Sequence, residues 1–350
     1  MDTRFGLFAL SLVCSLGCSS PSASLPSGAD APAAPSGDVV TADAASQAED
    51  PQSADVDSRF IVHEWGTLTT RHTKDGQQQW TKDERVEPLP SFVYENWMSP
   101  AKQDAKGTMR LETPVIYFYS QEQREVSVRV EFPEGFLTEW YPFAQHEDTL
   151  ERAALSWPLV RLHPGPDPEY PRAGESHYYA ARETDATPIS VGEDEATQWE
   201  KLLFYRGVGS ATTPLDVGYS GEDSVMLLPY ATRGAAALLF VREGDELGFT
   251  PIPKIAGSEP VELPALDDDL DDLRAYLREL LILEGLYPRE ADAMLATWES
   301  LWFEPGRRLI YMLPREATDQ LLPLSIEPAP DELVRVIVGR VDLPDEFPTP

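Results

Sequence analysis

Residues 124–132, REVSVRVEF, alternate strictly between polar and apolar side chains, and this period-two pattern constrains the fold more than any other feature. Successive side chains of an extended strand point to opposite faces. Val126, Val128, Val130 and Phe132 therefore share one face. The pattern predicts a strand with one buried face and one face in water.

Runs of β-branched and aromatic residues extend this pattern along the chain. TPVIYFYS lies before the alternating run and GFLTEWYPF after it, so residues 111–143 predict a meander of neighbouring antiparallel strands. The other strand candidates are FIVHEWGTLTT, WPLVRLH, KLLFYRG, DSVMLLPYA, AAALLFVREG, ELGFTPIP, RRLIYMLP, PLSIEP and ELVRVIVGRV. No helical pattern intervenes between the early runs, so we expect a mainly β (α+β) fold, an antiparallel β-sandwich-like domain rather than parallel βαβ winding.

Residues 267–304 are the one long stretch with a helical period. Leucines spaced three and four apart in LDDLRAYLRELLIL form one stripe, and Gly285 follows as the expected C-terminal cap. A second helix begins near Pro288 and places Met294, Trp298 and Trp302 on one face. We expect a helical hairpin that packs on the sheet, and REATDQLL predicts a further short helix after it.

The first 17 residues predict a secretory signal. Arg4 precedes an apolar run from Phe5 to Leu16, which is too short to span a bilayer comfortably. The following SLGC resembles the lipobox of bacterial lipoproteins. That resemblance implies cleavage before Cys18 and acylation of this residue as a membrane anchor, with ordinary secretion as the alternative. Ser19 after the cysteine favours the outer membrane over the inner one, by analogy with bacterial sorting.

Residues 18–58 predict a disordered tether. After Cys18 the segment is rich in Ser, Ala, Pro, Gly and Asp and contains no aromatic residue, Lys or Arg. It cannot bury enough apolar surface to offset its ordering entropy. A flexible chain of this length has a typical reach of about 35 Å. Residues 59–350 predict a single β-rich globular unit held away from a membrane surface.

Charge and cysteine content exclude several classes of function. The formal net charge is −32, which disfavours nucleic acid as a partner and direct docking on anionic lipid. The chain has 2 cysteines, Cys14 and Cys18, so one leaves with the signal and the other carries the lipid. The mature body therefore has no disulfide, cysteine nucleophile or zinc–thiolate site.

His63 and Glu64 lie side by side in FIVHEWGTLTT. The order is not His-Glu-x-x-His, so the helical zinc-protease geometry is absent. Neighbouring side chains of a strand point to opposite faces and cannot bind one ion without a bulge. We favour a scaffold role, in which one residue packs, hydrogen-bonded, near Trp65 and the other is solvated.

Residues 175–185, ESHYYAARETD, form a dense polar cluster. It could be a ligand-binding loop, with contacts from Tyr178, Arg182 and Asp185. It could equally be a network that fixes a long connection between strands, because an arginine paired with a carboxylate needs no substrate. Trp140 in TEWYP is a candidate stacking platform for a carbohydrate, and packing in the core is its alternative.

Several motifs together resemble those of a family of bacterial exported proteins and lipoproteins with an HEWGT opening. The motifs are FIVHEWGTLTT, LETPVIYFYS, TEWYP, SHYYAARETDA, LFYRGVG, GLYPREADAMLATWESLWF and EPAPDELVRVIVGR. They span nearly the whole body of the chain, which supports one coherent unit from Arg59 onward. The family has no established activity, so the resemblance assigns no catalytic role to any residue.

As function we expect a cell-envelope lipoprotein that recognises a ligand, glycan or protein outside the cytoplasm. The alternative is a periplasmic or surface hydrolase that uses His63, Glu64, His177 and Glu183. If the two histidines met in space with a carboxylate, a site for a divalent metal would form. A purely structural role in the envelope is the third reading. The sequence carries no specific cofactor motif and no signal for an oligomeric state.

Overall fold

The computed structural model describes residues 58–73, 76–77, 80–81, 88–96, 106–149, 153–209, 211–221 and 223–347. The described residues all belong to one compact unit. The predicted signal sequence, Cys18 and the tether up to residue 57 lie outside the described residues.

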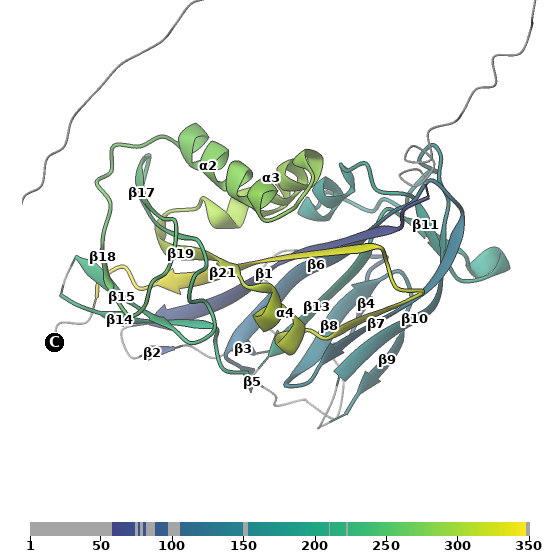
Figure 1. Ribbon diagram of the computed structural model, residues 1–350, viewed down its shortest axis with the longest axis horizontal. Coiled ribbons are helices and arrows are strands. Elements are labelled where there is room, and N and C mark those ends of the chain that lie inside the picture. The colour runs from purple at the N-terminus through teal and green to yellow at the C-terminus, as the bar shows by residue number, and fades with distance from the viewer. Residues whose placement is uncertain are drawn as a thin grey trace, which may run out of the picture. The chain divides into compact units, whose positions relative to one another are not determined.

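A large central sheet organises this unit (Figure 1). Its ten strands are β1 (Ile61–Thr73), β2 (Gly76–Gln77), β4 (Tyr94–Glu95), β6 (Met109–Tyr119), β8 (Gly135–Tyr141), β13 (Leu203–Gly209), β16 (Ala237–Glu243), β17 (Glu246–Ile252), β19 (Gly306–Leu313) and β21 (Glu332–Leu343). They pair in the order β17-β16-β19-β21-β1-β6-β13-β8-β4, and β2 pairs with β1 alone. The first and last long strands, β1 and β21, are therefore neighbours in the middle of the sheet.

Two smaller sheets cover one face of the central sheet. The first pairs in the order β12-β11-β10-β7-β20, with β9 on β10; its strands are β7 (Arg124–Phe132), β9 (Gln145–Asp148), β10 (Ala153–Leu162), β11 (Ile189–Val191), β12 (Gln198–Glu200) and β20 (Leu324–Glu327). The second is β14 (Leu215–Tyr219), β15 (Ser224–Pro229) and β18 (Pro260–Glu262). Their apolar side chains share one core with the central sheet. Four further elements are short. Strands β3 (Trp80–Thr81) and β5 (Lys106–Gly107) pair with each other, and the 3-10 helix η3 (Asp194–Ala196) and helix α4 (Arg315–Leu321) lie in connections between strands.

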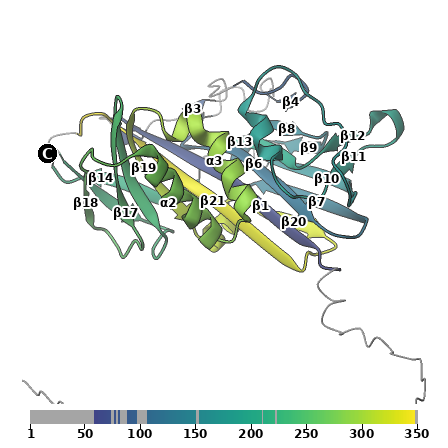
Figure 2. The ribbon, with the colours of Figure 1, turned by 90° about the horizontal axis from the view of Figure 1, so that it is seen from above.

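Helices cover the other face of the central sheet. Helix α2 (Leu270–Leu283) and helix α3 (Pro288–Trp302) lie over its strands in Figure 2, with the 3-10 helix η2 (His177–Arg182) beside α3. The stripe predicted from sequence is buried at Leu277, Met294 and Trp298, within a second core that this layer shares with the sheet. The hairpin is thus confirmed, and Gly285 adopts a φ of 111° just after α2, a conformation that glycine favours.

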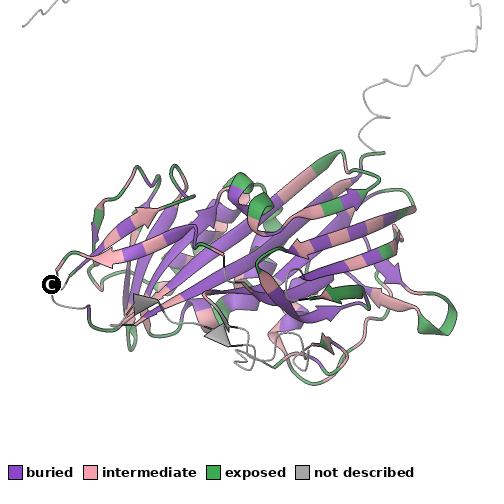
Figure 3. Ribbon diagram, turned by 90° about the horizontal axis from the view of Figure 1, so that it is seen from below, coloured by how far each residue is buried: buried purple, intermediate pink, exposed green. Residues whose placement is uncertain are grey.

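Burial distinguishes the layers and corrects one prediction. Strand β7 alternates between buried and half-buried residues from Val126 onward, whereas β8 is buried at six consecutive positions after Gly135. Figure 3 shows strands with alternating colours as well as strands that are buried along most of their length. A strand buried on both faces belongs to a sheet with a layer on each side. In agreement with these patterns, β6 and β8 belong to the central sheet and β7 belongs to the six-stranded sheet. Strands that follow each other in the chain thus lie in different sheets, and the predicted meander over residues 111–143 is wrong.

The fold class is confirmed: the domain is mainly β and sandwich-like, its sheets are mostly antiparallel, and the helical hairpin comes late. The exception is the parallel pairing of β1 with β21, in which Glu64 lies opposite Arg335. Arg335 Nε donates to Glu64 Oε2 at 2.5 Å, and both side chains are buried. Arg335 also donates to Asp319 Oδ1 and to the Leu322 carbonyl, so one guanidinium joins β21 to β1 and to the α4 region.

We expect Glu64→Gln to lower the free energy of unfolding by about 3 kcal/mol, because removing one partner leaves a buried charge poorly compensated. The double variant Glu64→Leu/Arg335→Met should lose less free energy of unfolding than the sum of the losses for Glu64→Leu alone and Arg335→Met alone. Chemical denaturation measures both. Glu332→Gln is the matched control, since its pair with Arg59 is exposed and contributes about 0.5 kcal/mol. Equal losses for Glu64→Gln and the control would contradict the expectation.

Candidate functional site

His63 faces the helical layer. Its Nδ1 lies 2.7 Å from Glu290 Oε2 near the start of α3, and the Glu290 carboxylate also accepts from the Tyr119 hydroxyl and the Tyr287 backbone N–H. The ring of His63 lies 4.4 Å from that of Tyr287, centroid to centroid. His63 is only 1% exposed, so this group joins the helix to the sheet rather than facing solvent.

Glu64 faces the opposite side of β1, as the strand geometry predicts. Its Oε1 accepts from the Tyr205 hydroxyl at 2.5 Å and its Oε2 from Arg335. Burial and the Glu64 charge raise the pKa of Tyr205 well above its ordinary value. Because β1 is covered on both faces, neither residue of the pair is solvated, and that part of the scaffold prediction is wrong.

The polar cluster at residues 175–185 contains η2 rather than an extended loop. Ser176 caps this short helix by accepting from the Tyr178 backbone N–H. Arg182 donates through Nε and a terminal nitrogen to the two oxygens of Glu200, at 2.8 and 2.5 Å, and Tyr178 donates to the same carboxylate. A bidentate arginine–carboxylate pair fixes geometry as well as charge.

Aromatic rings surround this buried pair. The guanidinium carbon of Arg182 lies 5.1 to 5.7 Å from the ring centroids of Phe92, Tyr170, Tyr178 and Tyr179. Burial raises the pKa of Glu200, while Arg182 and the Lys201 backbone N–H lower it, and the net direction is upward. Burial also raises the pKa of Tyr178, so this phenol stays a hydrogen-bond donor. The network interpretation of Arg182 and Tyr178 thus has a direct structural basis.

A polar cavity of about 590 Å³ lies beside η2. Cationic, acidic and phenolic side chains line it: Arg172, Arg182, Lys201 and Arg289, then Asp167, Glu169, Glu183 and Asp185, and finally Tyr170 and Tyr179. Lys201 is buried and its Nζ lies 2.5 and 2.6 Å from the two oxygens of Asp167. Asp185 pairs with Arg289 of α3. The cavity therefore presents both cationic and anionic side chains, of which Lys201 and Arg182 are held by buried or partly buried ion pairs.

The predicted catalytic residues His63, Glu64, His177 and Glu183 do not form one site. His177 is half-buried at η2, with its ring 6.1 Å from that of Trp298, centroid to centroid. Trp298 lies eight residues beyond Glu290 on α3, a distance of about 12 Å along the helix, so His63 and His177 contact different turns of the same helix. Glu183 is exposed at the cavity, and Glu64 lies on the far face of β1. Within the described residues, no three His, Cys, Asp or Glu side chains are arranged to hold a metal ion.

Trp140 lies apart from the other predicted ligand-binding residues. It is buried in the core between the central sheet and the two smaller sheets, whereas η2 lies in the helical layer. Its ring stacks on Tyr94, with centroids 6.4 Å apart, and lies 4.9 Å from the ring of His146. Of the four predicted ligand contacts, only Arg182 and Asp185 line the polar cavity.

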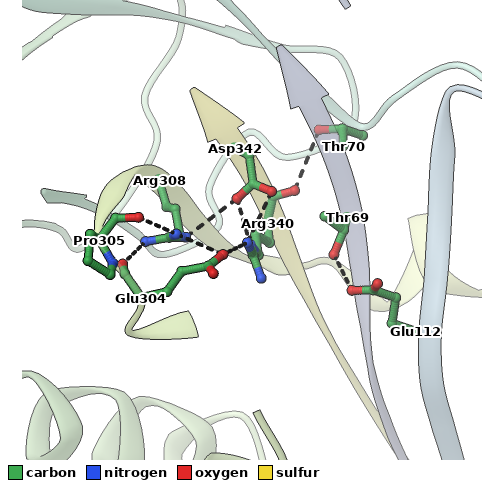
Figure 4. Close-up of polar contacts among 8 residues, drawn as sticks. All are labelled: Thr69, Thr70, Glu112, Glu304, Pro305, Arg308, Arg340 and Asp342. Carbon is green, nitrogen blue, oxygen red and sulfur yellow. Dashed lines mark hydrogen bonds and ion pairs between the residues drawn. The ribbon is translucent and has the colours of Figure 1, made fainter. Parts of the chain in front are cut away.

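Sequence reasoning also missed a group of charges around two buried arginines near the end of α3. Arg340 bonds to Asp342 and Glu304, while Arg308 donates to the backbone carbonyls of Glu304 and Pro305 and lies 3.5 Å from Asp342 (Figure 4). Thr69 donates to Glu112 nearby. Burial and the Arg340 charge lower the pKa of Arg308. The available signal was the pair of arginines, Arg335 and Arg340, that flank the apolar run of β21.

Comparisons with known proteins assign no family. No family model matches the chain, and no curated protein matches it. Among solved structures, it is similar to the Fcho1 mu homology domain of Danio rerio with bound Eps15 peptide, at 8% identity over 81% of this chain and 94% of that chain, with a TM-score of 0.29. A likeness at this TM-score carries no argument about fold or function. Membership of the exported HEWGT family stays a prediction.

Two histidines outside the cavity lining, His72 and His163, make the stability of the fold depend on pH. Burial lowers the pKa of His72, although Asp216, 3.2 Å away, acts in the opposite direction. Burial and the Arg161 charge lower the pKa of His163, whose Nε2 lies 2.8 Å from Ser190 Oγ. A histidine in an unfolded chain has a pKa of about 6.5. As pH falls, His72 and His163 are therefore protonated in the unfolded chain at a higher pH than in the folded chain.

We expect the free energy of unfolding to fall as pH drops from about 7.5 through about 6.5 and toward the lower pKa values of the folded protein. The variant His72→Gln/His163→Gln should lose less stability over the same interval. Urea denaturation at several pH values measures the difference. Parallel curves for the variant and the natural protein would contradict this expectation.

Proposed function

We propose that this protein is an outer-membrane lipoprotein that binds a polar ligand outside the cytoplasm. The N-terminal signal pattern and the SLGC motif before Ser19 support the address and the anchor. No helix of the described residues is both long enough and apolar enough to cross a bilayer. The acylated Cys18 is the membrane attachment in this proposal.

The polar cavity beside η2 is the observation that carries the binding proposal. Its volume of about 590 Å³ lies within the range of small-ligand pockets, about 300–1,000 Å³. Its wall is preorganised, because Lys201 is locked to Asp167 and Arg182 to Glu200. A rigid wall loses little conformational entropy when a ligand binds.

The lining favours a ligand rich in hydroxyl groups, such as a glycan. Carboxylates accept hydrogen bonds from ligand hydroxyl groups and guanidinium groups donate to them, and the lining holds both. Tyr170 and Tyr179 add phenol rings, whose faces pack on apolar surfaces and whose hydroxyl groups bind polar ones. The guanidinium of Arg172 lies 4.5 Å from the centroid of the Tyr179 ring and is held in place by it.

Cys18→Ser should release the protein from the membrane fraction into the soluble envelope fraction, because the acyl chains are the anchor in this proposal. Fractionation of envelopes followed by immunoblotting measures the shift. Ser20→Ala, two residues away, is the matched control and should leave the protein in the membrane fraction. Retention of the Cys18→Ser protein in the membrane would contradict the anchor.

For the cavity, we expect one or more oligosaccharides from a panel of neutral, amino and uronic acid sugars to bind saturably to the full-length chain carrying Cys18→Ser. The double variant Arg172→Gln/Glu183→Gln should weaken binding about tenfold, because two hydrogen bonds to charged groups are lost. Titration calorimetry measures the affinity. Glu195→Gln is the control, since this exposed glutamate lies in η3 outside the cavity. The proposal fails if no sugar binds, or if binding is unchanged in the double variant.

A further inference from the structure

We infer that the protein has a second binding site, for a small amphiphile with an alkyl chain and a cationic head group. The site is an apolar cavity of about 290 Å³ between the central sheet and its neighbours. Its central-sheet residues belong to the core shared with the two smaller sheets, whereas the polar cavity adjoins η2 in the helical layer. The two sites therefore lie on opposite sides of the central sheet.

The cavity follows from the way the outer layer is built. Two separate sheets cover one face of the central sheet, and Phe132 at the end of β7 and Pro214 just before β14 both line the cavity. Leu68, Leu111 and Ile337 of the central sheet form the floor of this cavity. The α4 region closes one side of it.

The floor and walls of the cavity select an apolar ligand. An apolar cavity of about 150 Å³ stays dry and binds benzene, and this cavity has about twice that volume. Moving an alkyl chain into it from water is favourable by about 0.8 kcal/mol for each buried methylene group. The small size of the cavity fits a single chain of moderate length.

The mouth of the cavity selects the head group. Glu134 is exposed, and it is the one charged side chain among the described residues that line this cavity. Tyr230, also at the lining, is 65% exposed. A carboxylate attracts a cation, and the face of an aromatic ring does the same. The formal net charge of −32 adds attraction for cations and repulsion of anions.

The protein for the test is the full-length chain carrying Cys18→Ser, kept free of detergent. The probe is octyltrimethylammonium, at concentrations below those at which it forms micelles. Titration calorimetry should show one saturable site, and octyl sulfate should bind at least about tenfold more weakly. Ala231→Trp places a large ring on an exposed lining residue and should weaken binding about tenfold or more. Glu134→Gln and Tyr230→Leu should each weaken it about threefold, the effect of one exposed charge or cation–π contact.

Glu246→Gln removes an exposed charge from β17, outside the cavity lining, and should leave the affinity unchanged. Thermal unfolding of each variant checks that the fold is retained. Absence of saturable binding, equal affinity for octyl sulfate, or normal binding by both Ala231→Trp and Glu134→Gln would overturn the inference. Binding to phosphatidylcholine vesicles without binding to the free amphiphile would also overturn it. Because the probes and variants differ from those of the polar cavity, either site can fail alone.

Discussion

The ion pair between Glu64 and Arg335 is the interaction on which the rest of the structure most depends. It crosses the parallel pairing of β1 with β21 at the middle of the central sheet, and Tyr205 of β13 completes it. The same guanidinium reaches Asp319 of α4. Burial alone would raise the pKa of Asp319, but Arg335 and Arg315 together hold it below its ordinary value. This one ion pair thus fixes three strands and a helix in relation to each other.

Buried polar contacts also join the layers to each other. His63 of β1 contacts Glu290 near the start of α3, and Arg182 of η2 pairs with Glu200 of β12 in the six-stranded sheet. Such contacts require a specific geometry, and the bidentate pair of Arg182 with Glu200 fixes orientation as well as charge. We infer that the apolar cores supply most of the stability, while the charge pairs fix the register of the layers. The walls of the polar cavity are rigid because they are extensions of these pairs.

Local periodicity made part of this fold predictable. The alternation in β7 and the leucine and tryptophan stripes of α2 and α3 depend on neighbours a few residues away, and all three elements were predicted. The assignment of strands to sheets depends on partners far along the chain, so the meander failed. The expectation that one of His63 and Glu64 is solvated failed for the same reason, since their partners Glu290 and Arg335 are 227 and 271 residues away. The polar cluster was visible as a cluster, but Glu200 and Lys201, which complete its site, carried no local signal.

The place of β1 in the sheet also has a consequence for how the chain acquires its structure. One long edge of β1 pairs with β6, but the other pairs with β21, which begins at Glu332. Contacts between residues so distant in sequence form late, since closing a long loop costs entropy before any pairing repays it. The centre of the molecule can therefore be completed only when β21 is present. A chain that emerges from its N-terminus through a narrow channel would keep one edge of β1 unpaired until β21 arrived.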